Sequence, residues 1–471
     1  MTRRSALMIF FSALTVRLLY LAIVYDGPGS LMHEDSAMYV NLADWLLMEP
    51  SARAAAEIDY SRMMYERAPG YIYFVAAFSW LFEDARLAIV LAQFVLDGFT
   101  CVMIGTLAAI IHQRLALLAG LFAALNFNMI INAGFVLSDS LFLLPFVAGM
   151  IALLVYLRRP SLAAALGVAA LFATALLIRP SLLYFPPVPM LMILIGAWHH
   201  RTGPRRAAGH VLVLPIVFAL FTGPIFLKNY EDFGHADYTT QTGTHALFWI
   251  YPQARELASG IPREQSLREM RARWNDYRAS IDNPADGTNP FEQSAEMKRV
   301  ATAAIRELGF LDLAKAWTIG TIINLSAPAI VVSPPVREME RPSFYETTGA
   351  DAADKIWNYL AEEPAFSLVI LPAALATIVV RLITILGFVQ LLPNGFVRGV
   401  PLPAPTLTWL PSAALLLIAF YVFAITGPIT GAKYRLPVEP VSDIFLAAAL
   451  IWIADIYRMR RRGAETPSRA T

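Results

Sequence analysis

Long apolar stretches recur from residue 6 to residue 457, and they constrain the fold more than any other feature of the chain. A stretch of about 18 or more apolar residues can cross the hydrocarbon core of a bilayer as a helix. The 471 residues are 57% hydrophobic and 15% charged, whereas soluble domains carry roughly 25% charged residues. Because a bilayer admits only helices and closed barrels, these Leu-, Ala- and Ile-rich stretches predict an all-α polytopic membrane protein.

We expect ten membrane spans. They lie near residues 6–25, 87–111, 115–133, 141–157, 161–178, 182–198, 208–227, 365–391, 406–426 and 440–457. The N-terminal stretch has no small-residue cleavage site, so it is interpreted as a retained span rather than a cleaved signal. Shorter helices at the interface would bring the number of helices at the membrane to about ten to thirteen.

Lys and Arg favour the cytoplasmic side of short loops, which orients these spans. The basic positions assigned to that side are Arg3-Arg4, Arg114, Arg158-Arg159, the loop 199–206 and the tail 458–462. Both termini are then cytoplasmic. Three outer segments remain, at roughly 26–86, 228–364 and 427–439.

Two apolar segments are expected not to cross. Residues 70–82 number thirteen, which gives a helix of about 20 Å against a core of about 30 Å. Counting them as a span would move Arg158-Arg159 outside. Residues 313–331 are long enough, but their crossing would strand the basic tail outside. We therefore expect re-entrant or interfacial helices at both places.

Three parts of the chain follow from this topology. They are an N-terminal membrane module at 1–227 with its outer loop at about 26–86, an extracytoplasmic subdomain at 228–364 with the interfacial helix 313–331, and C-terminal spans with a cytoplasmic tail at 365–471.

The first outer segment holds the acidic pair Glu34-Asp35. Adjacent residues diverge by about 100° on a helix, so one carboxylate can enter a cleft while the other supports it. Asp35 and Tyr39 share a face of the expected helix. Asp35 is equally suited to cap that helix. Arg67 stands before Pro69-Gly70, where it can hold a lipid phosphate or simply snorkel to the interface.

Further charged residues fall at the outer ends of spans. Asp139 is either a functional carboxylate at membrane depth or a helix cap. The outer cations are Arg179, Lys228, Lys433 and Arg435. Cations on the outer side need an anionic partner, such as a lipid headgroup or a bound phosphate. Beside carboxylates they can neutralise a phosphate leaving group while a carboxylate deprotonates an acceptor.

Other chemistries receive little support from the sequence. The single cysteine, Cys101, lies in an apolar stretch, so thiolate metal clusters are excluded. His33, His235 and His245 show no metal-site spacing and are expected to be structural or hydrogen-bonding residues. Two outer carboxylates leave a divalent metal open. The net charge of +1 argues against nucleic acid as a partner.

Several short motifs, in this order, resemble the GT-C class of integral membrane glycosyltransferases. They are EDSAMYVNLA (34–43), ERAPGYIYFVAAF (66–78), the stretch 96–125, FVLSDSLF (135–142), LLIRPSLL (176–183), PIFLKNYEDFG (224–234) and KYRLPVEP (433–440). Within that class the chain is similar to bacterial relatives of protein mannosyltransferases and of aminoarabinose transferase. Lys228 stands where many relatives carry Arg.

The resemblance implies a polyprenyl-phosphate-linked sugar as donor, used on the extracytoplasmic face of the bacterial cytoplasmic membrane. It also assigns residues. Asp35, with Glu34 beside it, would be the essential first-loop acid, and Asp139 the second. Arg67 would be the basic residue before the Pro-rich motif, and Lys433 to Arg435 the cationic motif before the last helix.

The sequence therefore predicts inverting transfer of a sugar to a hydroxyl of a glycan, lipid or protein. Asp35 would be the general base. Arg67, Lys433 and Arg435, together with Lys228 and Arg179, would bind the donor phosphate. The expected supporting residues are Tyr39, Tyr434 and His33. The alternatives are a lipid or sugar transporter, whose charges would gather near the bilayer midplane, and a non-catalytic assembly protein.

Overall fold

The computed structural model describes residues 1–58, 60–281, 288–340, 342, 347–391 and 407–464. These residues form helices and connecting segments, with no strand among them. The first residue of the expected span 406–426, and parts of the expected C-terminal region 365–471, lie outside the described ranges. The all-α polytopic architecture is confirmed.

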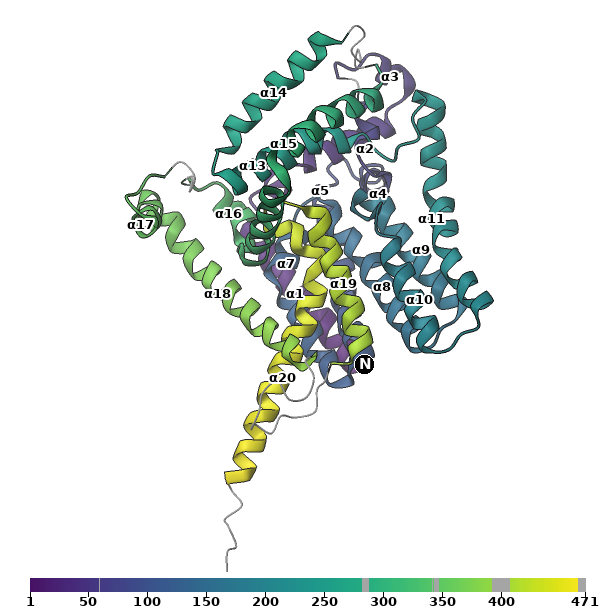
Figure 1. Ribbon diagram of the computed structural model, residues 1–471, viewed down its shortest axis with the longest axis vertical. Coiled ribbons are helices and arrows are strands. Elements are labelled where there is room, and N and C mark those ends of the chain that lie inside the picture. Colours follow the sequence, from purple (N-terminus) through teal and green to yellow (C-terminus); the bar gives the residue numbers. More distant parts are fainter. Residues whose placement is uncertain (59, 282–287, 341, 343–346, 392–406, 465–471) are drawn as a thin grey trace, which may run out of the picture.

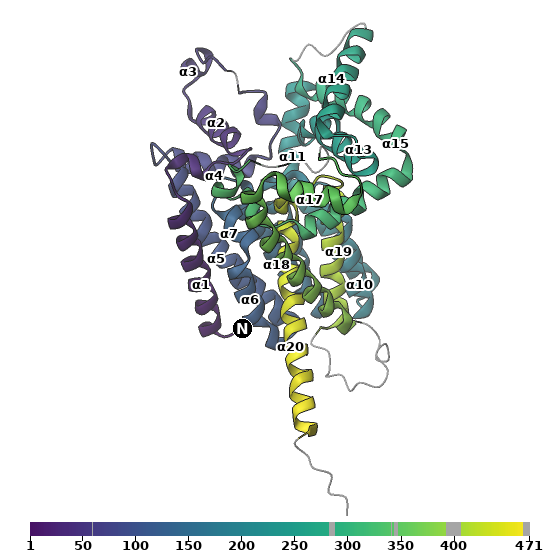
Figure 2. The same ribbon diagram turned by 90° about the vertical axis from the view of Figure 1, so that its left-hand side faces the viewer.

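Seven helical segments are long and apolar enough to cross a membrane. They are α1 (Arg3–Val24), α5 (Arg86–Ile111), α8 (Ser138–Arg158), α11 (Pro204–Phe233), α18 with the short helix η7 (Pro364–Leu391), α19 (Trp409–Thr426), and the 3₁₀ helix η8 joined to α20 (Ala432–Arg461). Each coincides with an expected span. The chain is thus a multi-pass membrane protein, and its helices run roughly side by side in Figures 1 and 2.

The other three expected spans differ from single full-length helices. The span 115–133 is broken into Gln113–Leu125 and Phe127–Ala133, which meet at an angle of 51°. Asn126 stands at the break, where its side chain caps the second helix, α7 (Phe127–Ala133). Helices α9 (Leu162–Ile178) and α10 (Pro187–His199) have 17 and 13 residues, about 26 and 20 Å.

Short helices of the first outer loop cover one end of the bundle, opposite the end where α1 begins and α20 (Glu439–Ala464) finishes (Figure 1). They are α2 (Ser36–Leu47), α3 (Pro50–Ala54) and α4 (Pro69–Ser79). The eleven residues of α4 rise about 17 Å, too little to cross. Its Gly70 packs directly on the backbone of Leu177, at the end of α9.

A helical subdomain extends from the same end (Figures 1 and 2). It contains α12 (Gln241–His245), the π-helical turn η5 (Ala246–Ile250), α13 (Tyr251–Ser259), α14 (Arg263–Ser280) and α15 (Pro290–Ser326). Leu247, Tyr251, Met270 and Trp274 build a small core of its own. Residues 313–326 of the helix expected at 313–331 belong instead to the second half of α15, which kinks at Gly309 (φ 78°), and the short 3₁₀ helix η6 (Ala329–Val332) follows.

Two short helices lie between the subdomain and α18 (Pro364–Phe388): they are α16 (Pro334–Arg337) and α17 (Ala352–Glu362). Helix α6 (Ala116–Leu125) is the longer part of the broken span before α7. The main core is formed by the facing sides of the spans, where a buried Arg17–Asp97 ion pair joins α1 to α5. A buried pair of this kind fixes how two helices meet, because an unpaired charge there would be very costly.

Candidate active site

A cavity of about 830 Å³ lies at the end of the bundle that carries α2, α4 and the subdomain. Eight of the residues singled out from the sequence line it: Glu34, Asp35, Tyr39, Arg67, Asp139, Arg179, Lys433 and Tyr434. They come from the first outer loop, from the start of α8, from the end of α9 and from η8 (Ala432–Val438). The folded chain therefore gathers, in one cavity, residues that are up to 400 positions apart in the sequence.

Asp35 lies between two cations in this cavity. Its Oδ1 accepts a hydrogen bond from Arg67 Nη2 at 2.9 Å, and its Oδ2 is 3.9 Å from Lys433 Nζ. Lys433 also donates to Glu34 Oε2 at 3.2 Å. Glu34 is the more exposed carboxylate, at 64% of its side chain, against 37% for Asp35. Of the adjacent pair, Asp35 therefore faces into the cavity while Glu34 lies at its rim.

The local fold explains why Asp35 is free to face the cations. Asp35 occupies the N-cap position of α2, but its side chain makes no capping hydrogen bond to that helix. The helix is instead fixed by its buried face, where the ring of Tyr39 packs edge-on against Tyr71 with centroids 4.7 Å apart. The arginine that reaches Asp35 stands two residues before α4, which begins with Pro69. The capping role for Asp35 is thus not realised.

Asp139 forms a second carboxylate–cation pair. It lies in the first turn of α8 and binds Arg179, the residue at which α9 ends. The negative charge is favourable there because the N-terminus of a helix carries partial positive charge. Tyr39 donates a hydrogen bond to the neighbouring Ser138 Oγ at 3.3 Å, so this pair is joined to α2.

The charges of the cavity change the acidity of Asp35. Burial by itself would raise the pKa of this carboxyl, but the positive charges of Arg67 and Lys433 outweigh it and hold the pKa below its ordinary value. Asp35 is therefore a carboxylate at neutral pH. A carboxylate whose pKa is lowered by two neighbouring cations is a weak base while both cations remain beside it.

The far wall of the cavity is apolar. It is formed by Leu183 and Tyr184 before α10, and by Tyr421, Val422 and Ile425 of α19. Tyr184 and Ile425 are 60% and 40% exposed, so the wall opens on the outside of the bundle. One cavity thus joins a charged end to an apolar surface between two membrane helices.

Two aromatic residues of the cavity were not singled out as site residues from the sequence. His245 and Trp249 line it from the subdomain, with ring centroids 6.3 Å apart. Burial, with the charge of Arg67 nearby, lowers the pKa of His245 to about 4. His245 was expected to be structural, and nothing around Trp249 distinguishes it from a core residue. Only the fold brings that helix to the cavity.

Arg435 was expected to bind the donor phosphate, and its position does not fit that role. It is 3% exposed, lies outside the cavity lining, and its Nε donates to Glu439 Oε1 at 2.7 Å. Its Nη1 donates to backbone carbonyls at the end of α15, Asn324 at 2.7 Å among them. Lys433, two residues earlier in the chain, is the cation of this motif that lines the cavity.

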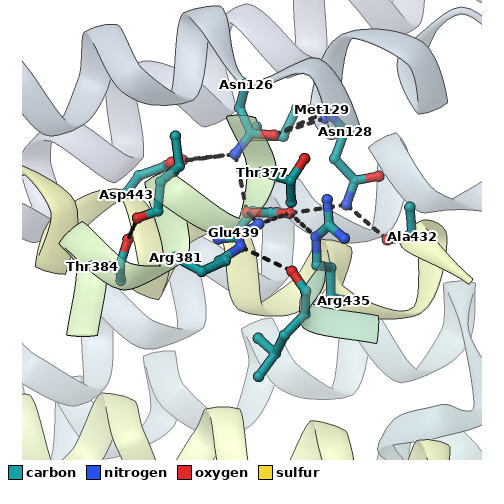
Figure 3. A network of polar contacts seen from close by, with 12 residues as sticks. Asn126, Asn128, Met129, Thr377, Arg381, Thr384, Ala432, Arg435, Glu439 and Asp443 are labelled. Carbon is teal, nitrogen blue, oxygen red and sulfur yellow. Dashed lines mark hydrogen bonds and ion pairs between the residues drawn. The ribbon is translucent and has the colours of Figure 1, made fainter. Parts of the chain in front are cut away.

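Glu439 is the centre of a buried polar network (Figure 3). Both of its carboxylate oxygens accept hydrogen bonds from Arg381 of α18 at 2.8 Å. Asn128 donates to Glu439 at 3.0 Å and to the Ala432 carbonyl at 2.8 Å. The network thus joins α7, α18 and α20 to the first residue of η8, and it positions the segment that carries Lys433.

Two other expected residues also lie outside the cavity lining. Lys228 projects from α11, is 65% exposed and pairs with Asp232 at 2.7 Å. The ring of His33 packs against Phe135 with centroids 5.1 Å apart. Lys228 is therefore not placed among the cations of the cavity, whereas His33 stays close enough to Asp35, Glu34 and Lys433 for their charges to act on it.

The described residues contain no group of three or more His, Cys, Asp or Glu side chains placed to hold a metal ion. The cavity carboxylates Asp35 and Asp139 are each bound by an arginine. These side chains do not fit a metal centre as they stand, so no step proposed below is assigned to a metal.

No protein-family model matches the chain, and no curated protein matches its sequence. Among solved structures, it is similar to the archaeal oligosaccharyltransferase AglB from Archaeoglobus fulgidus, solved with an inhibitory peptide and a dolichol-phosphate. The TM-score is 0.50 and the identity 14%, over 98% of this chain and 52% of that chain. The chain thus spans about half the length of AglB, and the likeness shows a common GT-C-like fold.

Proposed function

We propose that this protein is a glycosyltransferase that moves a sugar from a polyprenyl-phosphate-linked donor to a hydroxyl acceptor. The observation that carries the proposal is the cavity itself. Its charged end holds Arg67, Arg179 and Lys433 against three carboxylates, and its other end is an apolar wall open between α10 and α19. A lipid phosphate has a matching anionic head and apolar tail.

The cations suit a phosphate. Arg67 and Arg179 present planar guanidinium groups, which bind phosphate oxygens in pairs, and Lys433 adds a compact positive charge. Each of these cations is bound to a carboxylate. An incoming phosphate competes for the same cations. When it draws Arg67 and Lys433 away, Asp35 loses the charges that hold its pKa low and becomes a stronger base.

The proposed reaction is an inverting displacement. The acceptor oxygen attacks the anomeric carbon, and the bond from that carbon to the phosphate oxygen breaks. The acceptor proton passes to Asp35, and the electron pair of the broken bond leaves with the lipid phosphate. Arg67, Lys433 and Arg179 stabilise the additional negative charge on that phosphate. Asp139 acts by holding Arg179 in place.

The apolar wall gives the donor tail a route into the bilayer. Tyr184 and Ile425 are partly exposed on the outside of the bundle, so an isoprenoid chain can lie between α10 and α19 while its phosphate reaches the charged end. The solved AglB structure contains a dolichol-phosphate, a lipid of this class.

We place the reaction on the extracytoplasmic face of a bacterial cytoplasmic membrane. The support is the distribution of charge: the end of the bundle opposite the cavity carries Arg3 and Arg4 at the start of α1, and Arg458, Arg460 and Arg461 near the end of α20 (Figure 1). Because Lys- and Arg-rich ends remain in the cytoplasm, the cavity end is outside.

The proposal is tested by a transfer assay with the purified full-length protein in liposomes. Undecaprenyl phosphate carrying mannose, glucose or 4-amino-4-deoxyarabinose is supplied with glycan, lipid A and peptide acceptors, and release of free undecaprenyl phosphate is measured. Acceptor-dependent release from at least one donor is expected. Binding of these lipids with no release from any donor would support a transporter instead.

A further inference from the structure

The helix that carries His245 and Trp249 has an unusual turn facing the cavity. Residues Ala246–Ile250 form a π-helical turn between α12 and α13. Such turns are rare, and they are frequent at functional sites because the extra residue changes where side chains point. Here both His245, directly before the turn, and Trp249, within it, line the cavity. Together they form an aromatic wall, which we call the His245–Trp249 wall.

The His245–Trp249 wall is held in place from behind. The Gly243 N–H donates to Ser294 Oγ of α15 at 3.1 Å, and a Cβ at Gly243 would collide with the Ser294 backbone. Within the turn, Leu247 is fully buried in the core of the subdomain. The Arg263 guanidinium stacks 4.6 Å from the centre of the Trp249 ring. The wall is therefore a preformed surface rather than a mobile loop.

The chemistry of the wall differs from that of the charged end. Trp249 offers a broad aromatic face, and such a face packs well against the C–H groups of a pyranose ring. His245 is neutral above about pH 5, because burial, with Arg67 nearby, lowers its pKa to about 4. A neutral imidazole has one donor and one acceptor nitrogen. The structure gives this ring no hydrogen-bond partner within the described chain.

We propose that the His245–Trp249 wall recognises the donor sugar, with Trp249 stacking on the pyranose ring and His245 hydrogen-bonding one of its hydroxyl groups. The sugar is bonded directly to the phosphate, so it must lie beside the cations that hold that phosphate. His245 is close enough to Arg67, Lys433 and Asp35 for their charges to act on it. This inference rests on the proposed function and names the part of the cavity that selects the sugar.

The test separates recognition of the sugar from recognition of the phosphate. Binding to the full-length protein is measured for undecaprenyl phosphate and for the same lipid carrying mannose, glucose or 4-amino-4-deoxyarabinose. For the wild type, at least one sugar-bearing lipid should bind more tightly than the bare lipid phosphate. Trp249→Ala should remove that preference, a loss of roughly five- to tenfold, while binding of the bare lipid phosphate is unchanged. Trp249→Phe should retain part of it.

Two further variants and one control variant complete the comparison. His245→Gln should weaken binding of the sugar-bearing lipid alone, whereas Arg67→Gln should weaken binding of both lipids. Trp357→Ala is the matched control, because Trp357 is 71% exposed on α17 and is not part of the cavity lining. It should change neither affinity.

The inference is overturned if Trp249→Ala and His245→Gln keep the sugar preference, or if they weaken both lipids equally, as a purely structural role would. It is also overturned if they raise only the KM for the acceptor, which would assign the wall to the acceptor. Those results leave the proposed function intact when the wild type still transfers sugar. A wild type that binds no lipid phosphate would overturn both.

Discussion

Asp35 lies between two cations that come from distant parts of the chain. Arg67 approaches it from the segment before α4 and Lys433 from η8, 399 residues further along the chain than Glu34. In the reaction proposed above, both cations leave Asp35 to bind the donor phosphate. At the scale of single residues, the same two side chains would first lower the pKa of Asp35 and then stabilise the leaving group.

The pH dependence of transfer follows from this arrangement. Asp35 must be deprotonated to act as a base, and in the free enzyme its pKa lies below the ordinary value. The acid limb of kcat/KM reports the free enzyme, so the wild-type profile should be flat from about pH 8 down to about pH 5. Arg67→Gln removes one of the charges that lower this pKa, and it should shift the acid limb to higher pH.

The control for this profile is Arg86→Gln. Arg86, the first residue of α5, pairs with Asp84 at the surface and is not part of the cavity lining, so its replacement should leave the profile unchanged. An Arg67→Gln profile whose acid limb stays in place, or moves to lower pH, would contradict the role given to Asp35.

The sequence could predict residues that stand at the ends of elements, but not how deep they lie. Asp35, Arg67, Asp139 and Arg179 all occur where a helix begins or ends, and all line the cavity. Lys433 and Arg435 occur in one short motif and were indistinguishable by pattern. The two side chains are two positions apart on η8 and point in different directions. As a result, Arg435 enters the buried network around Glu439. That difference depends on contacts with α15 and α18, which the sequence does not display.

At the scale of elements, the site depends on α4, a short helix that packs against the end of α9. A Cβ at Gly70 would be 2.7 Å from the Leu177 carbonyl oxygen. This close approach holds the start of α4, and with it Arg67, against α9. The expectation that 70–82 does not span the membrane came from its length. The reason for Gly70 became apparent only from the packing.

Gly70→Ala should therefore destabilise the protein and weaken donor binding. Forcing a methyl group into a packed interface costs about 1–3 kcal/mol, and relief of the clash moves Arg67. Gly209→Ala is the control, because Gly209 lies in α11 with no atom within 4 Å of its added Cβ. That change should leave the unfolding temperature equal or higher, since alanine favours a helix. Equal unfolding temperatures for both variants would show that α4 does not depend on this contact.

At the scale of the whole molecule, the fold separates two ends of different chemistry. The subdomain and the first outer loop lie at one end, and the start of α1 and the end of α20 lie at the other (Figure 1). Residues of that loop and that subdomain line the cavity. Hydropathy predicted the long spans well, because a helix of twenty apolar residues has few alternatives. It did not predict the bend at Asn126 or the short length of α10, because hydropathy reports how apolar a stretch is and not where a helix bends or begins.

The orientation of these two ends can be measured by cysteine labelling in intact cells. Native Cys101 is fully buried, so background labelling should be low. Asp276→Cys, on the exposed surface of α14, should react with a membrane-impermeant maleimide from outside. Arg460→Cys, near the end of α20, should react only after the cells are permeabilised. The reverse pattern would place the cavity in the cytoplasm and contradict the proposed face.

The most direct test of the account compares turnover of Asp35→Asn with that of Asp84→Asn in the liposome transfer assay. Asp84 is also an arginine-bound carboxylate, but it lies at the surface and outside the cavity lining. Asp35→Asn should lose about 10²–10⁴-fold in turnover while its unfolding temperature and lipid-phosphate binding persist. Asp84→Asn should retain wild-type turnover. Near-normal transfer by Asp35→Asn would contradict the assignment of Asp35 as the base.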